Sequence, residues 1–228
     1  MAITLYDLAG ADPNRRFSPY CWRIKLALAH KQLDFETIPW RYADKDKIAF
    51  ANWDRVPVLV DNGRPVVDSW AIAAYLENTY PARPALFSGS PEASRFFNVW
   101  ADTVLNPAIA RFVVLDILNH LTPTDQPYFR RTREERLGQR LEDVVKDRDQ
   151  RLATFAQTLE PVRQTVAAQP FLGGASPLYA DYIVFGSLMW ARCISPLRLL
   201  PSDDALEGWS ERMLDVGDGL GRRALRYW

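Results

Sequence analysis

The chain has 228 residues, of which 48% are hydrophobic and 12% aromatic, so it can bury a large core and is far from the composition of disordered proteins. Its 28 basic and 28 acidic residues balance, which excludes the strongly basic surface typical of proteins that bind nucleic acid or anionic membranes. No apolar run approaches the roughly 18 residues of a membrane span, and the start of the chain lacks the pattern of a signal peptide. Because Cys21 and Cys193 are the only cysteines, no disulfide framework is expected, and the composition predicts a soluble cytoplasmic protein.

The first eighty residues alternate between strand and helix patterns. Residues 3–8 alternate apolar and polar side chains, as in a strand, and the apolar spacing over 19–30 favours a helix that begins at Pro19 after a Ser18 N-cap. Strands are also predicted at 34–39, 56–61 and 64–69, with an Asn62-Gly63 hairpin between the last two, and a helix at 70–80 after a Ser69 cap. With a helical turn or two inside the irregular stretch 40–55, the predicted order is β-α-β-α-β-β-α.

After a stretch rich in Pro, Gly and Ser at 81–93, the sequence shows only helical patterns. One helix is predicted over 92–120. A long charged helix is predicted over 130–151, where the mixed signs of charge favour a solvent-exposed face. Pro161 must begin or kink a helix. The segment 180–194 is apolar on nearly every side, so it predicts a buried central helix.

Four motifs, in this order and spacing, resemble the glutathione transferase family. They are SPY at 18–20, RVPVLVD at 55–61, VVDSWAIAAYL at 66–76, and FLGG with ADYIVFG between 171 and 186. The resemblance implies an α+β fold with a thioredoxin-like, glutathione-binding N-terminal domain over 1–82, a linker at 83–92, and an all-α domain over 93–228 that supplies most of the acceptor-substrate site. It also implies glutathione as the co-substrate and a homodimer.

A narrower resemblance points to one branch of this family. The segments SPYCWRIKLALAHK, GQRLEDV and DGLGR are most similar to the bacterial β-etherases, which cleave lignin-derived aryl ethers with glutathione, and to their fungal relatives. This resemblance implies a hydrophobic, aromatic electrophile. The reaction is then either conjugation, as in detoxification, or β-aryl ether cleavage.

Ser18 is the candidate catalytic residue. An ordinary thiol has a pKa of about 8.5, and lowering it by two units requires roughly 2.7 kcal/mol in favour of the thiolate. A helix N-terminus supplies up to about 2 kcal/mol, and a hydroxyl that donates to a charged sulfur adds about 1.5–3 kcal/mol. Ser18 at the N-cap offers both, so we expect it to hold the glutathione thiolate. The alternative is a plain N-cap serine.

Cys21 offers a different chemistry. In thioredoxin-like C-x-x-C motifs the first cysteine is the nucleophile and the fourth residue is the resolving cysteine. Here the order is S-x-x-C, so we expect Cys21 to be a buried small apolar residue rather than a nucleophile. A thiol–disulfide oxidoreductase that uses Cys21 stays open as an alternative function. Cys193 lies in the predicted buried helix and is expected to be inert.

Five residues are expected from the resemblance to bind glutathione. Val56-Pro57 implies a cis peptide bond that turns the Val56 backbone towards the cysteinyl unit of glutathione. At the γ-glutamyl end, Asp68 suits the ammonium group, while Ser69 and the N–H groups of the helix that it caps suit the carboxylate. Arg55 is a candidate for binding the glycine carboxylate.

The acceptor pocket is expected to be aromatic and apolar. Its candidate residues are Phe17, Tyr20 and Trp40 from the first domain and Trp100, Phe112 and Leu115 from the second. A place in the hydrophobic core is the alternative for each. The two histidines lack companions at ligand spacing, so no metal site is predicted, and neither nucleic acid nor a membrane is an expected partner.

The sequence thus predicts a cytoplasmic glutathione transferase whose thiolate attacks a hydrophobic small-molecule electrophile. Besides the Cys21 oxidoreductase, one further alternative stays open, which is a protein that carries glutathione conjugates or hydrophobic ligands without turnover.

Overall fold

A four-stranded mixed sheet forms the base of the first half of the chain. The computed structural model describes residues 3–228 and orders the strands β2-β1-β3-β4. Their bounds are Ile3–Leu8 (β1), Phe35–Trp40 (β2), Val58–Asp61 (β3) and Arg64–Val67 (β4). β1 pairs in parallel with β2 and antiparallel with β3, which pairs antiparallel with β4. The predicted strands are therefore confirmed: β1 has the predicted bounds, and the other three differ from them by one or two residues.

Helices in this half are α1 (Pro19–His30), a 3₁₀ helix η1 (Lys45–Ala51) and α2 (Ser69–Thr79). The resulting β-α-β-α-β-β-α order is the predicted one. Val58 pairs with Val67 across β3 and β4, so one step further along the same pairing Pro57 lies opposite Asp68. The register therefore brings two of the predicted glutathione-binding segments to the same end of the sheet.

The second half of the chain is helical, as predicted. Its elements are α3 (Pro91–Trp100), a π-helical turn (Ala101–Leu105), α4 (Asn106–His120), α5 (Asp125–Leu137), α6 (Leu141–Val144), a 3₁₀ helix (Arg148–Arg151), α7 (Leu152–Thr158), α8 (Glu160–Ala168), α9 (Tyr179–Ile194), α10 (Ala205–Leu214) and α11 (Val216–Gly219). Within residues 3–228 no helix is both long and apolar enough to cross a membrane.

Three details differ from the sequence predictions. The prediction of one long charged helix over 130–151 is wrong, because α5 begins at Asp125 and ends at Leu137, and the next residue, Gly138, has a left-handed φ of 67° that stops the helix. The helix predicted over 92–120 is interrupted by the π-helical turn. The cap of α2 is Asp68 rather than Ser69, since the Asp68 carboxylate accepts the N–H groups of Trp70 and Ala71.

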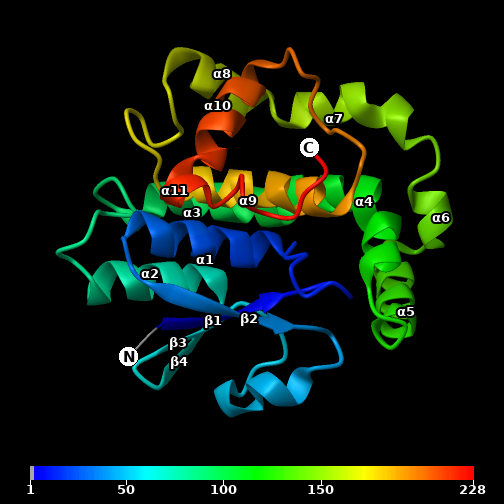
Figure 1. Cartoon of the computed structure of the whole chain (residues 1–228). Coiled ribbons are helices and arrows are strands. Elements are labelled where there is room, and N and C mark those ends of the chain that lie inside the picture. The colour runs from blue at the N-terminus through cyan, green and yellow to red at the C-terminus, as the bar shows by residue number, and fades with distance from the viewer. Residues whose placement is uncertain (1–2) are drawn as a thin grey trace.

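The two halves meet where α1 packs on α9. Figure 1 shows α1 between the sheet and the helices α3, α4 and α9. Gly186 in α9 permits the close approach, because a Cβ at this position would lie 2.8 Å from the carbonyl oxygen of Pro19. The first turn of α1 is therefore fixed against a buried helix. The limits 1–82, 83–92 and 93–228 stay a prediction, and residues 1–2 of the first predicted domain lie outside the described residues.

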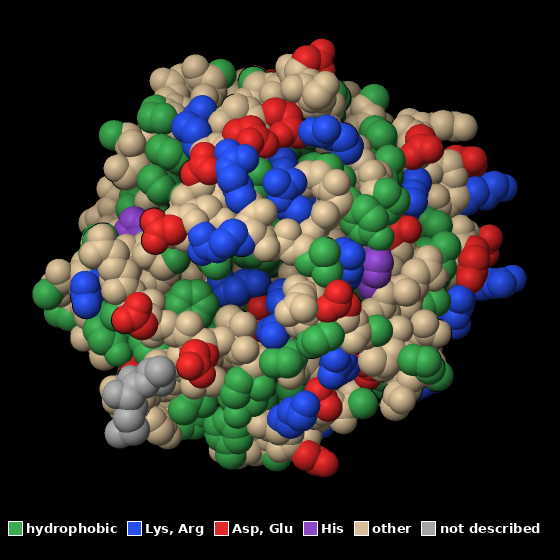
Figure 2. All heavy atoms as spheres, in the orientation of Figure 1, with side chains coloured by type: hydrophobic (Ala, Val, Ile, Leu, Met, Phe, Trp, Pro, Cys, Tyr) green, Lys and Arg blue, Asp and Glu red, His purple; other side chains and the backbone are tan. Residues whose placement is uncertain are grey.

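Charged side chains are mixed over the surface. On the face in Figure 2, basic and acidic side chains lie interspersed, in line with equal numbers of the two in the sequence.

Candidate active site

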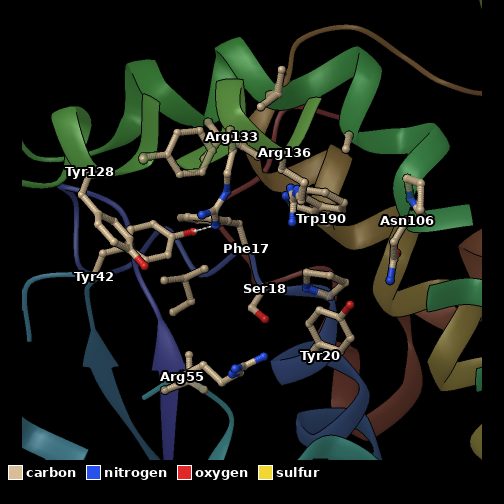
Figure 3. A pocket seen from close by; sticks show the side chains of 18 of the residues that line it. Phe17, Ser18, Tyr20, Tyr42, Arg55, Asn106, Tyr128, Arg133, Arg136 and Trp190 are labelled. Carbon is tan, nitrogen blue, oxygen red and sulfur yellow. Dashed lines mark hydrogen bonds between the residues drawn. The ribbon is translucent and has the colours of Figure 1, made fainter. Parts of the chain in front are cut away.

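Ser18 lies at the start of α1, where backbone and side chain together form a helix cap. Its φ and ψ are extended, Pro19 takes the first helical position, and the Ser18 hydroxyl oxygen accepts the N–H of Cys21 at 3.3 Å. Because that oxygen acts as the acceptor, the hydroxyl proton is left to donate elsewhere. Ser18 is 3% exposed, and Figure 3 shows its hydroxyl directed into a cavity.

The cavity lies between the start of α1 and the helices α4 and α5. Its volume is about 710 Å³, within the usual range of small-molecule sites. Ser18 is on its wall together with a set of aromatic side chains, namely Phe17, Tyr20, Trp40, Tyr42, Tyr128, Phe129 and Trp190. The cavity can thus hold a planar apolar group beside the Ser18 hydroxyl.

Only the first-domain half of the predicted acceptor pocket lines this cavity. Phe17, Tyr20 and Trp40 do so, whereas Trp100, Phe112 and Leu115 do not. On α4 the cavity contacts Pro107, Ala110, Arg111, Val114 and Ile117, which recur at the three- and four-residue spacing of one helix face. Phe112 lies on another face and packs on Phe155 with ring centroids 5.3 Å apart.

Sequence reasoning missed the contribution of α5. Phe129, Arg133, Arg136 and Leu137 recur at the spacing of one helix face, and all of them line the cavity. This spacing could have indicated a shared helix face, but the mixed charges over 130–151 favour a solvent-exposed helix instead. Trp190 was also missed. Its helix is apolar on nearly every side, so the sequence pattern does not indicate which of its faces lines a cavity.

An ion pair between buried Arg23 and half-buried Asp102 fixes the wall next to Tyr20. Arg23 in α1 is fully buried and donates to Asp102 at 2.9 Å and to Asn98 at 3.0 Å. Asp102 lies in the π-helical turn and lines the cavity. Burial, and next the Asp102 charge, raise the pKa of Tyr20, so its hydroxyl keeps its proton at neutral pH.

Val56 and Arg55 both line the cavity, and Figure 3 shows Arg55 below Ser18. The Val56–Pro57 peptide bond is cis, and the backbone N–H and carbonyl of Val56 form no hydrogen bond within residues 3–228. An extended peptide could therefore pair with this backbone. The Arg55 side chain is 72% exposed and donates to Asp54 at 3.1 Å. Pro57 is buried and does not line the cavity.

Asp68 and Ser69 lie outside the cavity, at the β4–α2 junction, where Asp68 lies opposite Pro57, one step beyond the Val58–Val67 pair. One Asp68 oxygen accepts the N–H groups of Trp70 and Ala71, both at 3.0 Å, while the other has no hydrogen-bond partner within residues 3–228. In the same range neither the N–H nor the hydroxyl of Ser69 donates a hydrogen bond. An acid and two donors are thus free to bind a zwitterion.

Cys21 lies in the first turn of α1 and does not line the cavity. It is fully buried, and burial together with the Asp7 charge raises the pKa of its thiol well above the ordinary value. Cys193 is also buried, with its pKa raised to about 11. A buried, protonated thiol is a poor nucleophile, so these surroundings do not favour an oxidoreductase that uses Cys21.

We expect neither cysteine to react with iodoacetamide at pH 8 in the native protein, and both to react after unfolding in urea. Burial excludes the reagent and the raised pKa removes the thiolate that would attack it. Mass spectrometry of labelled peptides measures each site separately. Rapid native labelling at Cys21 alone would return the oxidoreductase to consideration.

Metal ligands are not clustered in this structure. Across residues 3–228 there is no group of three or more His, Cys, Asp or Glu side chains arranged to hold a metal ion.

Comparisons with known proteins match both halves of the chain. A family model for the glutathione S-transferase N-terminal domain matches residues 17–79, and one for the C-terminal domain matches residues 93–200. A probable glutathione S-transferase, GSTU6 of Oryza sativa subsp. japonica, is 28% identical over 86% of this chain and 80% of its own length.

Solved structures agree in fold. The glutathione transferase GSTFuA3 of Phanerochaete chrysosporium superposes with a TM-score of 0.76 at 26% identity, covering 99% of this chain and 95% of that one. CsGST83044 of Ceriporiopsis subvermispora, whose structure is a complex with glutathione, gives a TM-score of 0.79 at 24% identity and covers 96% and 98% of the two chains.

Proposed function

Because the chain belongs to the glutathione S-transferase family, we propose that it transfers glutathione to a hydrophobic, aromatic electrophile, and that Ser18 holds the attacking thiolate. The observation that carries this proposal is the Ser18 hydroxyl, which caps α1 and faces a cavity of about 710 Å³ with aromatic walls. The helix N-terminus and the hydroxyl together supply enough stabilisation to keep the sulfur ionised near neutral pH.

In the reaction the thiolate sulfur attacks an electrophilic carbon and forms a C–S bond. The bond to the leaving group breaks, and the leaving group departs with its electron pair as a halide or, in an aryl ether, as a phenoxide. Ser18 donates its hydrogen bond to the sulfur before attack and loses that interaction as the charge leaves. No general base is required, because the thiol proton is released to solvent when glutathione binds.

Glutathione is proposed to bind along the edge of the sheet. The free Val56 backbone pairs with the cysteinyl unit, Arg55 takes the glycine carboxylate, and Asp68 with Ser69 binds the γ-glutamyl end. The register of β3 and β4 supports this assignment, because it brings these segments to one end of the sheet. The acceptor then occupies the space towards α4 and α5.

Aryl ether cleavage, the etherase-type reaction, is a narrower proposal. Its support is the aromatic lining of the cavity, which suits aryl halides equally well. The segment Asp218–Arg222, part of the etherase resemblance, does not line the cavity. A homodimer is also proposed, because α3 and the π-helical turn expose Phe96 (69%), Val99 (48%) and Val104 (43%).

The test is a glutathione assay with a nitroaryl chloride and with a β-aryl ether, each compared with the spontaneous reaction. Turnover above the spontaneous rate supports the transferase, and the two substrates separate conjugation from ether cleavage. Saturable binding of glutathione conjugates with no product at all would instead favour the carrier.

Replacement of Asp68 by asparagine is expected to weaken glutathione binding about 10- to 150-fold, with no large change in stability. Asparagine keeps the oxygen that caps α2 and caps helices as well as aspartate, so the structure is retained. It removes the charge that pairs with the γ-glutamyl ammonium, an interaction of about 1.5–3 kcal/mol. Titration calorimetry with glutathione measures the change.

The matched control for this variant is Glu36→Gln, which removes an exposed acid on β2 away from the cavity. It should bind glutathione like the parent protein. Equal affinity of the Asp68→Asn variant and the parent would remove Asp68 from the binding site.

A further inference from the structure

The cavity wall carries more basic than acidic side chains. Lys45, Arg55, Arg111, Arg133 and Arg136 line it, against the two carboxylates of Asp54 and Asp102. Both carboxylates already have partners, since Asp54 pairs with Arg55 at 3.1 Å and Asp102 with Arg23 at 2.9 Å. Within residues 3–228, none of the other four basic side chains forms a salt bridge.

The arginines of α5 divide into two groups by helix face. Arg130 and Arg131 point away from the cavity, and each pairs with a glutamate four residues later, Glu134 at 2.9 Å and Glu135 at 3.5 Å. Arg133 and Arg136 face the cavity, and four residues after them stand leucine and arginine. The two outer arginines of α5 are thus paired with glutamates, whereas the two that face the cavity have no acidic partner among the described residues.

Arg133 is held in place by neutral groups. It donates to the Tyr42 hydroxyl at 3.3 Å and to the Thr132 hydroxyl at 2.8 Å, and its guanidinium lies over the Phe129 ring at 4.5 Å. Arg136 has no hydrogen-bond partner within residues 3–228. Figure 3 shows both arginine side chains extending from α5 into the cavity, and partial burial together with the Arg133 charge lowers the pKa of Arg136. An anion between them would relieve that repulsion.

We propose that the acceptor substrate carries an anionic group, a carboxylate on an aromatic ring, and that Arg133 and Arg136 bind it. This rests on the proposed function and narrows its substrate class. Guanidinium groups match a carboxylate in planar hydrogen-bond geometry, and the aromatic walls suit the attached ring. Figure 3 shows both arginines on the opposite side of Ser18 from Arg55, away from the proposed glutathione edge.

Two electrophiles that differ in charge and by one methyl group test the assignment, para-carboxybenzyl bromide and its methyl ester. After subtraction of the spontaneous reaction, we expect the parent protein to prefer the acid in kcat/KM by about tenfold or more. Arg133→Gln and Arg136→Gln should each lower the acid-to-ester ratio of kcat/KM about tenfold. Arg131→Gln, on the outer face of α5, is the matched control and should keep the preference.

Each result separates this inference from the function on which it rests. Turnover of the ester as efficient as that of the acid overturns the inference and leaves the transferase in place. An unchanged preference together with a raised KM for glutathione in Arg136→Gln would assign the arginines to the glycine carboxylate instead. If neither electrophile reacts above the spontaneous rate, the proposed function fails.

If neither electrophile reacts, the equilibrium binding of unreactive ligands still tests whether the arginines bind an anion. We expect para-toluate to bind the parent protein more tightly than para-toluamide, and Arg136→Gln to abolish the difference. Equal binding of the two ligands by the parent would overturn the anion site.

Discussion

Replacement of Ser18 by alanine is expected to raise the pKa of bound glutathione by about one to two units and to lower kcat near neutral pH by about 10- to 100-fold. The hydroxyl oxygen accepts the N–H of Cys21 and points into the cavity, so its proton can donate to a sulfur bound there. Alanine removes that donor but leaves the helix N-terminus in place. Part of the thiol activation should therefore survive.

The pH profile distinguishes this chemical role from a structural one. Thiolate forms above the pKa of the bound thiol. The rate of the parent protein therefore falls only when the pH drops below the lowered pKa of the glutathione thiol that it binds. The variant should lose activity at a higher pH and recover as the pH rises above the value of a free thiol, about 8.5. Ultraviolet absorbance of the bound thiolate measures the pKa directly.

Two further variants make the Ser18 test specific. Ser18→Thr keeps a hydroxyl and should restore a lowered thiol pKa. Tyr20→Phe removes the other hydroxyl near the start of α1, whose own pKa is raised by burial and by Asp102, and it should change the thiol pKa little. If Tyr20→Phe raises the thiol pKa and Ser18→Ala does not, the donor to sulfur is Tyr20.

Alanine at this position also removes a helix cap, at a cost of about 1 kcal/mol in the free energy of unfolding. Urea unfolding of the Ser18→Ala variant measures that cost separately. A small loss of stability with a large shift in the pH profile is the expected combination.

Sequence patterns predicted the features that depend on near neighbours along the chain. Ser18 followed by Pro19 favours a helix start by local geometry alone, and the hairpin at Asn62-Gly63 follows from turn chemistry. The same local rules misassigned the cap of α2. Both Asp68 and Ser69 are good capping residues, and the positive φ of Asp68 (70°), which decides between them, depends on how β4 enters the helix.

The far wall of the cavity depends on how distant helices pack, so local patterns could not identify it. Phe112 and Val114 are both apolar residues of α4, but only Val114 faces the cavity, because the side of α4 that packs on its neighbours is set by tertiary contacts. Arg133 and Arg136 are harder still to assign. In sequence they are indistinguishable from Arg130 and Arg131 except for the absence of an acid four residues later.

Replacement of Asp181 by alanine is expected to lower the free energy of unfolding by about 3–5 kcal/mol, the largest loss of stability that we predict for a single substitution. Asp181 is fully buried in the first turn of α9. One carboxylate oxygen accepts the N–H of Leu172 at 2.7 Å and the indole N–H of Trp209 at 2.9 Å, and the other accepts the N–H groups of Gly173 and Leu178 at 2.9 and 3.0 Å.

Burial raises the pKa of Asp181, and these four hydrogen bonds oppose that shift. Alanine would leave four donors without an acceptor, the buried indole of Trp209 and three part-buried backbone N–H groups, each at a cost of up to about 1–3 kcal/mol before the structure relaxes or water enters. The same carboxylate ties the turn before α9 and the helix α10 to the start of α9, on which α1 packs. The loss should therefore spread beyond a single helix cap.

Urea unfolding followed by tryptophan fluorescence measures the effect, and two variants calibrate it. Asp203→Ala removes an exposed acid in the loop before α10 and should change stability by less than about 0.5 kcal/mol. Trp209→Phe keeps a buried ring but removes one of the four donors, so it should cost less than Asp181→Ala. A loss below about 1 kcal/mol for Asp181→Ala would mean that water replaces the carboxylate without cost, and that the packing of α9 alone positions α1 and Ser18.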